Sequence, residues 1–306
     1  MTQSAGQPTP IHSIYAPWGR FGLYTFLIDA PELALVDTGV TATAQGVADG
    51  LAELGRDIKD VKWILLTHGH IDHLGGTVAL WEMTGRNARV VIHEDDVDYL
   101  QRRRAHVENY LNLRANYLDD PEAEAKQTEM MEHAISGEMT PDVVVKGGEV
   151  LDLGGVKVRV VHTPGHTRGS VAYVVDGQED VFVGDAVQIH GAANGFPGYE
   201  DPDAYRDSLL RIQQETPNRM FLGHPFRSAA GEAYPVELNR EQSTRVLQEA
   251  IDIEARVREA ALTIGAAASE SPYSPFAAIA GHLGYEGDPT LEPSPFFTTL
   301  HGYLQA

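Results

Sequence analysis

The hydrophobic positions in the first hundred residues follow two patterns in turn. Some stretches are short apolar runs typical of β-strands, whereas others place apolar residues at helical spacing, as Val47, Leu51 and Leu54 do. The apolar runs cover residues 21–29, 34–39, 61–67 and 88–93, and the helical stretches cover 41–57 and 74–83. A turn at Pro31 and Glu32 predicts a hairpin from the first two runs. Strands that alternate with helices indicate an α/β architecture.

The pattern changes between Glu94 and Thr140. Apolar residues recur there at spacings of seven, four and seven, at Leu100, Val107, Leu111 and Leu118. This spacing predicts an amphipathic helix, and a shorter helix is expected at about 123–135. Two interpretations stay open for the segment. It packs on the core, or its tyrosines, Tyr110 and Tyr117 among them, line one wall of a substrate pocket as a lid.

Short strands return in the second half of the chain. Apolar runs cover residues 143–145, 156–161, 170–175 and 181–184. A helix at 203–214, a last strand that ends at His224 and a long helix beyond Pro235, with Leu238 among its apolar positions, are expected to follow. We therefore expect a main domain in residues 1–234, with a helical insertion at about 94–140. A helical extension at 235–306 is expected to pack on the same domain.

The composition excludes several classes of protein. The chain carries 44 acidic and 23 basic residues, so its formal net charge is −21. Such a surface repels a phosphate backbone, which argues against a nucleic-acid partner. The first ten residues lack the basic and apolar segments of a signal peptide, and no stretch approaches 18 apolar residues, so we expect a cytoplasmic protein without a membrane partner. The chain has no cysteine, and any metal must therefore be held by nitrogen and oxygen ligands.

Metal-ligand residue types cluster directly after the strand predicted at 61–67. His68, His70, Asp72 and His73 form the pattern H-x-H-x-D-H. A sharp turn at a strand-to-helix junction directs alternate side chains into one cavity, and Gly69 fits such a turn. Three imidazoles and a carboxylate within six residues therefore predict a metal site.

Three further residues of the same types each follow a β-type run. They are His166, Asp185 and His224. Loops at strand ends are where α/β proteins place their sites. Together the seven side chains exceed what one tetrahedral zinc ion needs, and they suffice for two metal ions with one bridging carboxylate.

These segments together resemble the metallo-β-lactamase superfamily of metal-dependent hydrolases. The likeness rests on THGHIDHLGG, HTPGHTRGS, the Gly-Asp of VFVGDA and the Gly-His of FLGHP, and runs from about Tyr24 to His224. It implies an α/β (α+β) fold, an αββα sandwich of two mixed β-sheets flanked by helices. The helical insertion and the C-terminal helical appendage would be additions to that sandwich.

Carried over residue by residue, the resemblance implies two divalent metal ions. His68, His70 and His166 would bind the first ion, Asp72, His73 and His224 the second, and Asp185 would bridge them. Asp37 matches a position that supports the metal loop. The implied reaction is hydrolysis by a bridging hydroxide, with Asp72 as the catalytic residue that orients it and passes its proton to the leaving group. Zinc suits these ligands best, although iron and manganese also accept them.

Differences between this chain and individual branches of the superfamily narrow the range of expected substrates. β-Lactamases with a similar histidine-rich site lack the aspartate found here as Asp185. Quorum-quenching lactonases resemble the seven-ligand site more closely, but many carry a tyrosine where this chain has Gln188. The acidic surface conflicts with the nucleases of the superfamily. We expect a small neutral or aromatic ester, lactone or activated aryl ether as substrate, with a thioester or a β-lactam as the alternatives.

Further features leave alternatives open. His190 follows Asp185 by five positions and is a candidate substrate contact. A non-catalytic metal-binding regulatory protein and an iron-dependent oxygenase are the competing classes of function. The C-terminal helices are expected to cap the sandwich or to form the interface of a homodimer or a larger homo-oligomer.

Overall fold

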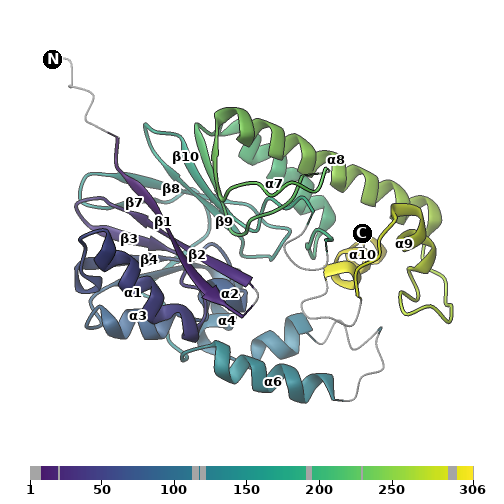
Figure 1. The fold of residues 1–306 in the computed structure, drawn as a ribbon, viewed down its shortest axis with the longest axis horizontal. Helices are drawn as coiled ribbons and strands as arrows, with labels where there is room; N and C mark the ends of the chain where they lie inside the picture. The colour runs from purple at the N-terminus through teal and green to yellow at the C-terminus, as the bar shows by residue number, and fades with distance from the viewer. Residues whose placement is uncertain are drawn as a thin grey trace.

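Two six-stranded β-sheets form the centre of the fold (Figure 1). The computed structural model describes residues 8–19, 21–111, 117, 122–190, 195–228, 230–288 and 295–305. The first sheet contains, in order, β1 (Ile11–Trp18), β2 (Phe21–Ile28), β3 (Leu33–Val36), β4 (Val61–Leu65), β5 (Arg89–His93) and β6 (Val143–Val145). β1 to β3 pair antiparallel, and β3 to β6 pair parallel.

The second sheet is built from the second half of the chain. From edge to edge it contains β12 (Glu237–Asn239), β11 (Arg219–Leu222), β10 (Asp180–Gly184), β9 (Val171–Val175), β8 (Lys157–His162) and β7 (Val150–Asp152). β10 and β11 pair parallel, and the other neighbours pair antiparallel. Both sheets are therefore mixed.

Three apolar layers hold the sheets and helices together. Between the sheets, the ring of Phe26 lies 5.6 Å from that of Phe182 and 5.4 Å from that of Phe221, centroid to centroid. The outer face of the first sheet is covered by α1 (Ala44–Glu53) and α3 (Thr77–Met83). The outer face of the second is covered by α7 (Pro202–Gln214) and α8 (Arg240–Ile264), and α9 (Ala277–Leu283) and α10 (Pro295–Gln305) pack against these helices. This order of layers confirms the αββα sandwich (Figure 1).

The long helix α8 begins and ends at clear local signals. The side chain of Asn239 accepts a hydrogen bond from the backbone N–H of Gln242, and the Gln242 side chain accepts one from the backbone N–H of Asn239, which satisfies two free N–H groups at the start. Gly265, with φ of 72°, follows the last turn. Val246 and Val257 are buried against the second sheet. No helix in the described ranges is both long and apolar enough to cross a bilayer.

The insertion differs from the expected helix. Among the described residues, the remaining helices are α2 (Ile71–Leu74), α4 (Val97–Gln101) and α6 (Ala123–Ala134), with 3-10 turns at Thr41–Thr43, Ile58–Asp60 and Glu94–Asp96 and a π-helical segment at His106–Leu111. The prediction of a single amphipathic helix is thus wrong, because Arg102 adopts an extended conformation (φ −140°, ψ 106°) that ends α4. Leu118 lies outside the described residues. Val107 and Met131 pack together beside Ile71 of α2, so the insertion lies against that helix.

Three strands lie outside the predicted set. β1 is an edge strand whose burial alternates along its length, with Tyr15 exposed, and it therefore has no continuous apolar run. β7 and β12 have three residues each, which is too short for a periodic signal. Leu238 belongs to β12 rather than to the long helix that follows it, and the strand predicted to be the last, β11, is therefore followed by another.

Candidate metal centre

The seven candidate ligands come from both sheets. His68 and His70 follow β4, and Asp72 and His73 lie on α2 directly after them. The second sheet contributes the other three from the ends of its strands. His166 lies in the loop between β8 and β9, Asp185 follows β10, and His224 lies two residues beyond β11. The site is therefore complete only where the two sheets meet.

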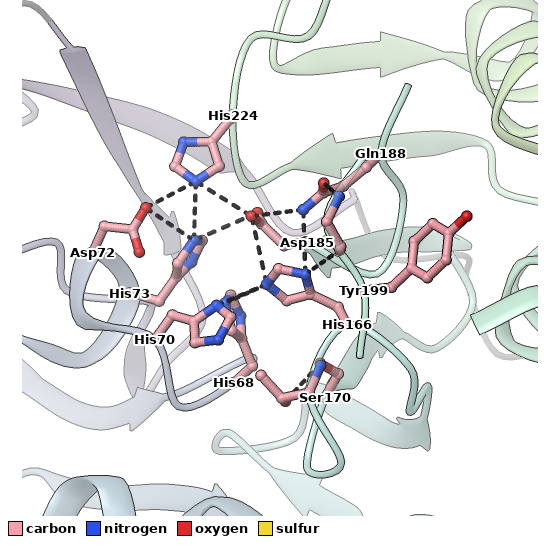
Figure 2. Close-up of polar contacts among 12 residues, drawn as sticks. His68, His70, Asp72, His73, His166, Ser170, Asp185, Gln188, Tyr199 and His224 are labelled. Atoms are coloured by element: carbon pink, nitrogen blue, oxygen red, sulfur yellow. Dashed lines mark hydrogen bonds and ion pairs between the residues drawn. The ribbon is translucent and has the colours of Figure 1, made fainter. Parts of the chain in front are cut away.

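The side chains form two ligand groups (Figure 2). The first ligand group is His68, His70 and His166, and the second ligand group is Asp72, His73 and His224; within each, the donor atoms lie within 4.8 Å of one another. The carboxylate of Asp185 lies between them. Its Oδ1 is 3.4 Å from His73 Nε2, and its Oδ2 is 3.8 Å from His166 Nε2 and 3.4 Å from His224 Nε2. The structure thus brings together all seven residues named from the sequence.

Two lone pairs face each other in the first ligand group. The Thr67 hydroxyl donates to the carboxylate of Asp37, so it accepts from His68 Nδ1, 3.1 Å away. His166 Nδ1 donates to the carbonyl oxygen of Gly198 at 2.7 Å. Burial lowers the pKa of both histidines, which favours neutral rings whose remaining nitrogens carry lone pairs. These two Nε2 atoms are 3.2 Å apart, a repulsive arrangement that a shared cation relieves.

Carboxylates surround the second ligand group. Asp37 Oδ2 accepts a hydrogen bond from His73 Nδ1 at 2.8 Å, which directs His73 Nε2 toward His224 Nε2, 3.2 Å away. Burial lowers the pKa of His73, but Asp37, Asp185 and Asp72 together raise it to about 10. In the same way, Asp185 and Asp72 outweigh burial and raise the pKa of His224. A divalent cation would replace the protons that balance this negative charge.

Gln188 supports the aspartate between the groups. Its Nε2 donates to Asp185 Oδ2 at 3.1 Å, and its Oε1 accepts from the backbone N–H of Gly198 at 2.6 Å. The other carboxylate oxygen, Asp185 Oδ1, is buried and accepts no hydrogen bond from any described residue. Gly223 lies directly against it, because a Cβ there would be 2.3 Å from Asp185 Oδ1.

The donor set fits two divalent cations. Five imidazole nitrogens and two carboxylates converge, one carboxylate oxygen is buried without a hydrogen bond from the described residues, and the outer nitrogens are fixed by Asp37, Thr67 and Gly198. Such outer partners orient metal ligands. Asp72 is the most exposed of the seven, with 32% of its side chain accessible. Burial raises its pKa, but His73 and His224 hold it below its usual range, so the carboxylate is ionised.

Comparison with known proteins identifies the family of the chain. The model of the metallo-beta-lactamase superfamily matches residues 18–224, which include all seven residues. The chain belongs to this superfamily. A metallo-beta-lactamase family protein from Thermus thermophilus has the same fold, with a TM-score of 0.67, 23% identity and coverage of 96% of this chain and 92% of that one.

Curated relatives resemble the superfamily region of the chain. A hydroxyacylglutathione hydrolase from Rhodopseudomonas palustris (strain BisB18) is 30% identical over 198 residues, which are 63% of this chain and 60% of the relative. An atrochrysone carboxyl ACP thioesterase from Aspergillus fumigatus is 27% identical over 201 residues, which are 63% of this chain and 47% of the relative. The chain therefore spans about half to three-fifths of the length of these relatives.

Two other residues named from the sequence belong to neither ligand group. His190 is half-buried, and burial and Arg256 of α8 lower its pKa; its role as a substrate contact stays a prediction. Tyr117 stacks on Phe297 of α10 with ring centroids 5.3 Å apart, and its hydroxyl bonds to His301. The insertion therefore contacts the C-terminal extension through this side chain. The side chain of Tyr110 lies outside the described residues.

Sequence reasoning missed three residues around the centre. Gly198 and Thr299 belong to no motif: Gly198 accepts a hydrogen bond from His166, and Thr299 bonds to the residues on either side of Gly198. Asp96 belongs to the acidic run Glu94 to Asp96 at the end of β5, and acidic side chains at a strand end could have indicated it.

Proposed function

We propose that the protein is a dinuclear metal-dependent hydrolase that cleaves a small, neutral carbonyl ester, and that thioesters are the first class to test. The convergence of three buried imidazoles carries the proposal, because His166 Nε2 lies 3.2 Å from His68 Nε2 and 2.9 Å from His70 Nδ1, and such a set of nitrogen donors favours a shared cation. The position of Asp185 between the two ligand groups supports a second ion beside the first.

Three observations support the choice of substrate. A hydroxyacylglutathione hydrolase and an ACP thioesterase are among the relatives, and both names describe thioester substrates. Gln188 stands where many lactonases have a tyrosine; it carries no phenol, and its amide is already bonded to Asp185 and Gly198. The net charge of −21 favours a neutral molecule over an anionic one.

The residues of the chain divide the chemical work. The two ligand groups and Asp185 would hold the ions, which when bound supply Lewis acidity and lower the pKa of a water molecule. Hydrolysis adds the water oxygen to the carbonyl carbon and breaks the bond from that carbon to sulfur or oxygen. Asp72, ionised and open to solvent, accepts the proton of the water and returns it to the leaving thiolate or alkoxide.

A substrate panel on protein of known metal content tests this proposal. The purified protein is loaded with zinc, manganese or iron(II), and its metal content is measured. Hydrolysis of a neutral thioester, an aryl ester, a lactone and a β-lactam is then followed with and without chelator. We expect two ions per chain and chelator-sensitive hydrolysis, fastest for the thioester. Two ions without turnover of any activated carbonyl would instead support the non-catalytic class of protein.

The Asp72→Asn variant tests the catalytic residue. It should retain at least one ion and lose about 100-fold or more in kcat, because general base catalysis contributes about 10²–10⁴-fold. Asp49→Asn is the matched control, since Asp49 is a carboxylate on α1, away from both ligand groups. Full activity of Asp72→Asn with intact metal content would contradict the assignment.

A further inference from the structure

A buried carboxylate lies just outside the seven-residue centre. Asp96 ends the 3-10 turn Glu94–Asp96 that follows β5, at the start of the insertion. Asp96 is 1% exposed. It belongs to neither ligand group, and the proposed reaction does not use it.

Asp96 joins the two loops that supply the first ligand group. Its Oδ2 accepts hydrogen bonds from the backbone N–H of Gly69 at 2.6 Å and from the Thr167 hydroxyl at 2.8 Å. Its Oδ1 accepts from the backbone N–H of Gly169 at 3.1 Å. Gly69 lies between His68 and His70, and Thr167 directly follows His166. One carboxylate thus connects the loop after β4 with the loop before β9.

Two glycines make room for this carboxylate. A Cβ at Gly169 would lie 2.4 Å from Asp96 Cγ, and a Cβ at Gly69 would lie 3.2 Å from Asp96 Cβ and 2.4 Å from the ring of Tyr99. The φ angle of Gly69 lies outside the left-handed region, so the turn expected from the sequence is not the reason for this glycine. Close packing of Asp96 and Tyr99 is the reason.

The three donors require a carboxylate at this position. Burial raises the pKa of Asp96 to about 6, although the hydrogen bonds from Thr167, Gly69 and Gly169 lower it. A carboxylate only accepts hydrogen bonds, whereas an amide of the same size would present N–H groups to at least one of these donors. Buried donors left without an acceptor are costly, so an amide would leave at least one of the three donors unpaired and weaken the link between the two loops.

We propose that Asp96 is a positioning residue that holds the two loops in register and thereby sets the metal affinity of the first ligand group, but not that of the second. This inference rests on the proposed function, because it requires that the centre binds metal. It extends the metal site to a residue of the insertion, outside both ligand groups.

Metal titrations of single-site backgrounds test the inference. His224→Ala disables the second ligand group, and His166→Ala disables the first. Zinc affinity of each background is measured by competition with a chromophoric chelator, with and without Asp96→Asn. We expect Asp96→Asn to weaken binding about 10- to 100-fold in the His224→Ala background, the range typical of outer partners of metal ligands. It should leave binding unchanged in the His166→Ala background.

Matched variants separate positioning from general stability. Asp95→Asn makes the same change at a neighbouring carboxylate whose side chain is 49% exposed, and it should have no effect. Thr167→Val removes one of the three donors and should weaken the first ligand group, whereas Thr167→Ser keeps the hydroxyl and should restore it. These two variants also report on Asp96 if Asp96→Asn fails to fold.

The outcomes distinguish the inference from the proposed function. If the wild-type chain binds no divalent cation, the proposed function fails. If the wild type binds two ions and Asp96→Asn changes neither group, or weakens both equally, the positioning role is overturned. Cobalt(II)-loaded protein provides an independent measurement. The d–d absorption of a cobalt ion bound by the first ligand group should change in Asp96→Asn and not in Asp95→Asn.

Discussion

Asp37 orients His73 of the second ligand group through the ring nitrogen that points away from the other ligands. Its carboxylate accepts hydrogen bonds from His73 Nδ1, from the Thr67 hydroxyl and from the Thr67 backbone N–H. Its φ angle is 59°, a left-handed conformation that aspartate and asparagine tolerate better than most residues. Replacement by asparagine therefore changes hydrogen bonding without straining the backbone.

The Asp37→Asn variant should bind metal more weakly. An amide nitrogen would face a donor, His73 would lose its fixed orientation, and we expect zinc affinity to fall about 10- to 100-fold. Titration of metal-free protein with zinc measures the change, and Asp49→Asn again serves as the control. Wild-type affinity in Asp37→Asn would show that His73 is oriented by other contacts.

His106 should make the protein sensitive to acid. Its Nε2 donates to the carbonyl oxygen of Tyr99, its Nδ1 is buried without a described partner, and burial lowers its pKa to about 4. Between about pH 6.5 and pH 4 the unfolded chain binds a proton at this residue and the folded chain does not. Stability therefore falls as the pH falls through this window, by about 3 kcal/mol for the whole shift.

The variant His106→Gln tests whether His106 causes the predicted loss of stability at low pH. Its amide can still donate to Tyr99 but does not titrate, so the free energy of unfolding should change less across the same pH window. Urea unfolding of metal-free protein at several pH values measures this. His282→Gln replaces an exposed histidine on α9 and should keep the wild-type slope. Equal slopes for His106→Gln and wild type would exclude the effect.

The residues of the centre differ in how far the sequence indicates them. His68, His70, Asp72 and His73 are adjacent in sequence, and three further ligands follow strand runs, so their residue types and positions predict a metal site. Asp96 has partners 27, 71 and 73 positions away. Only the completed fold brings such distant donors to one carboxylate, and the sequence shows no more than an acidic run at the end of a strand.

At the scale of elements, α10 supports the first ligand group from outside the region shared with the superfamily. The Thr299 hydroxyl donates to the carbonyl oxygen of Pro197 at 2.8 Å and accepts from the N–H of Tyr199 at 3.1 Å. These contacts flank Gly198, whose carbonyl oxygen orients His166. The C-terminal helix therefore fixes the segment of residues 197–199, whose Gly198 carbonyl orients His166.

The Thr299→Val variant should loosen that loop. Valine has the same shape but leaves a buried donor and a buried acceptor unpaired, which costs about 1–3 kcal/mol each. We expect a lower melting temperature and weaker metal binding in the first ligand group, measured by calorimetry and zinc titration. Thr299→Ser keeps both hydrogen bonds and should remain close to wild type. A similar loss in both variants would point to packing of the methyl group instead.

The elements that the sequence predicts are those with a strong periodic signal. The strands β4, β5, β9 and β10 and the helices α7 and α8 have continuous apolar runs or apolar faces, and they lie where expected. β1 has a half-exposed edge, β12 has three residues, and the insertion bends at Arg102. β1 and β12 form strands because they pair with a neighbouring strand, and the insertion departs from one continuous helix because of the backbone conformation of a single residue, Arg102.

At the scale of the whole molecule, the charge of −21 should affect anionic substrates selectively. The Debye length falls from about 30 Å at 0.01 M salt to about 8 Å at 0.15 M, so salt screens the repulsion between the surface and an anion. We expect kcat/KM for an anionic thioester to rise about two- to ten-fold over this range. A neutral thioester of equal size should show no such rise, and an equal response of both would contradict the charge argument.

The division of the centre between two sheets also has a consequence for folding. His68 and His166 are 98 positions apart, and His73 and His224 are 151 apart. A chain in which one sheet has formed holds at most four of the seven side chains, so it captures an ion weakly. Metal uptake should therefore be a late event in refolding, and the bound ions should slow the separation of the two sheets, so that the holoprotein unfolds more slowly than the metal-free chain.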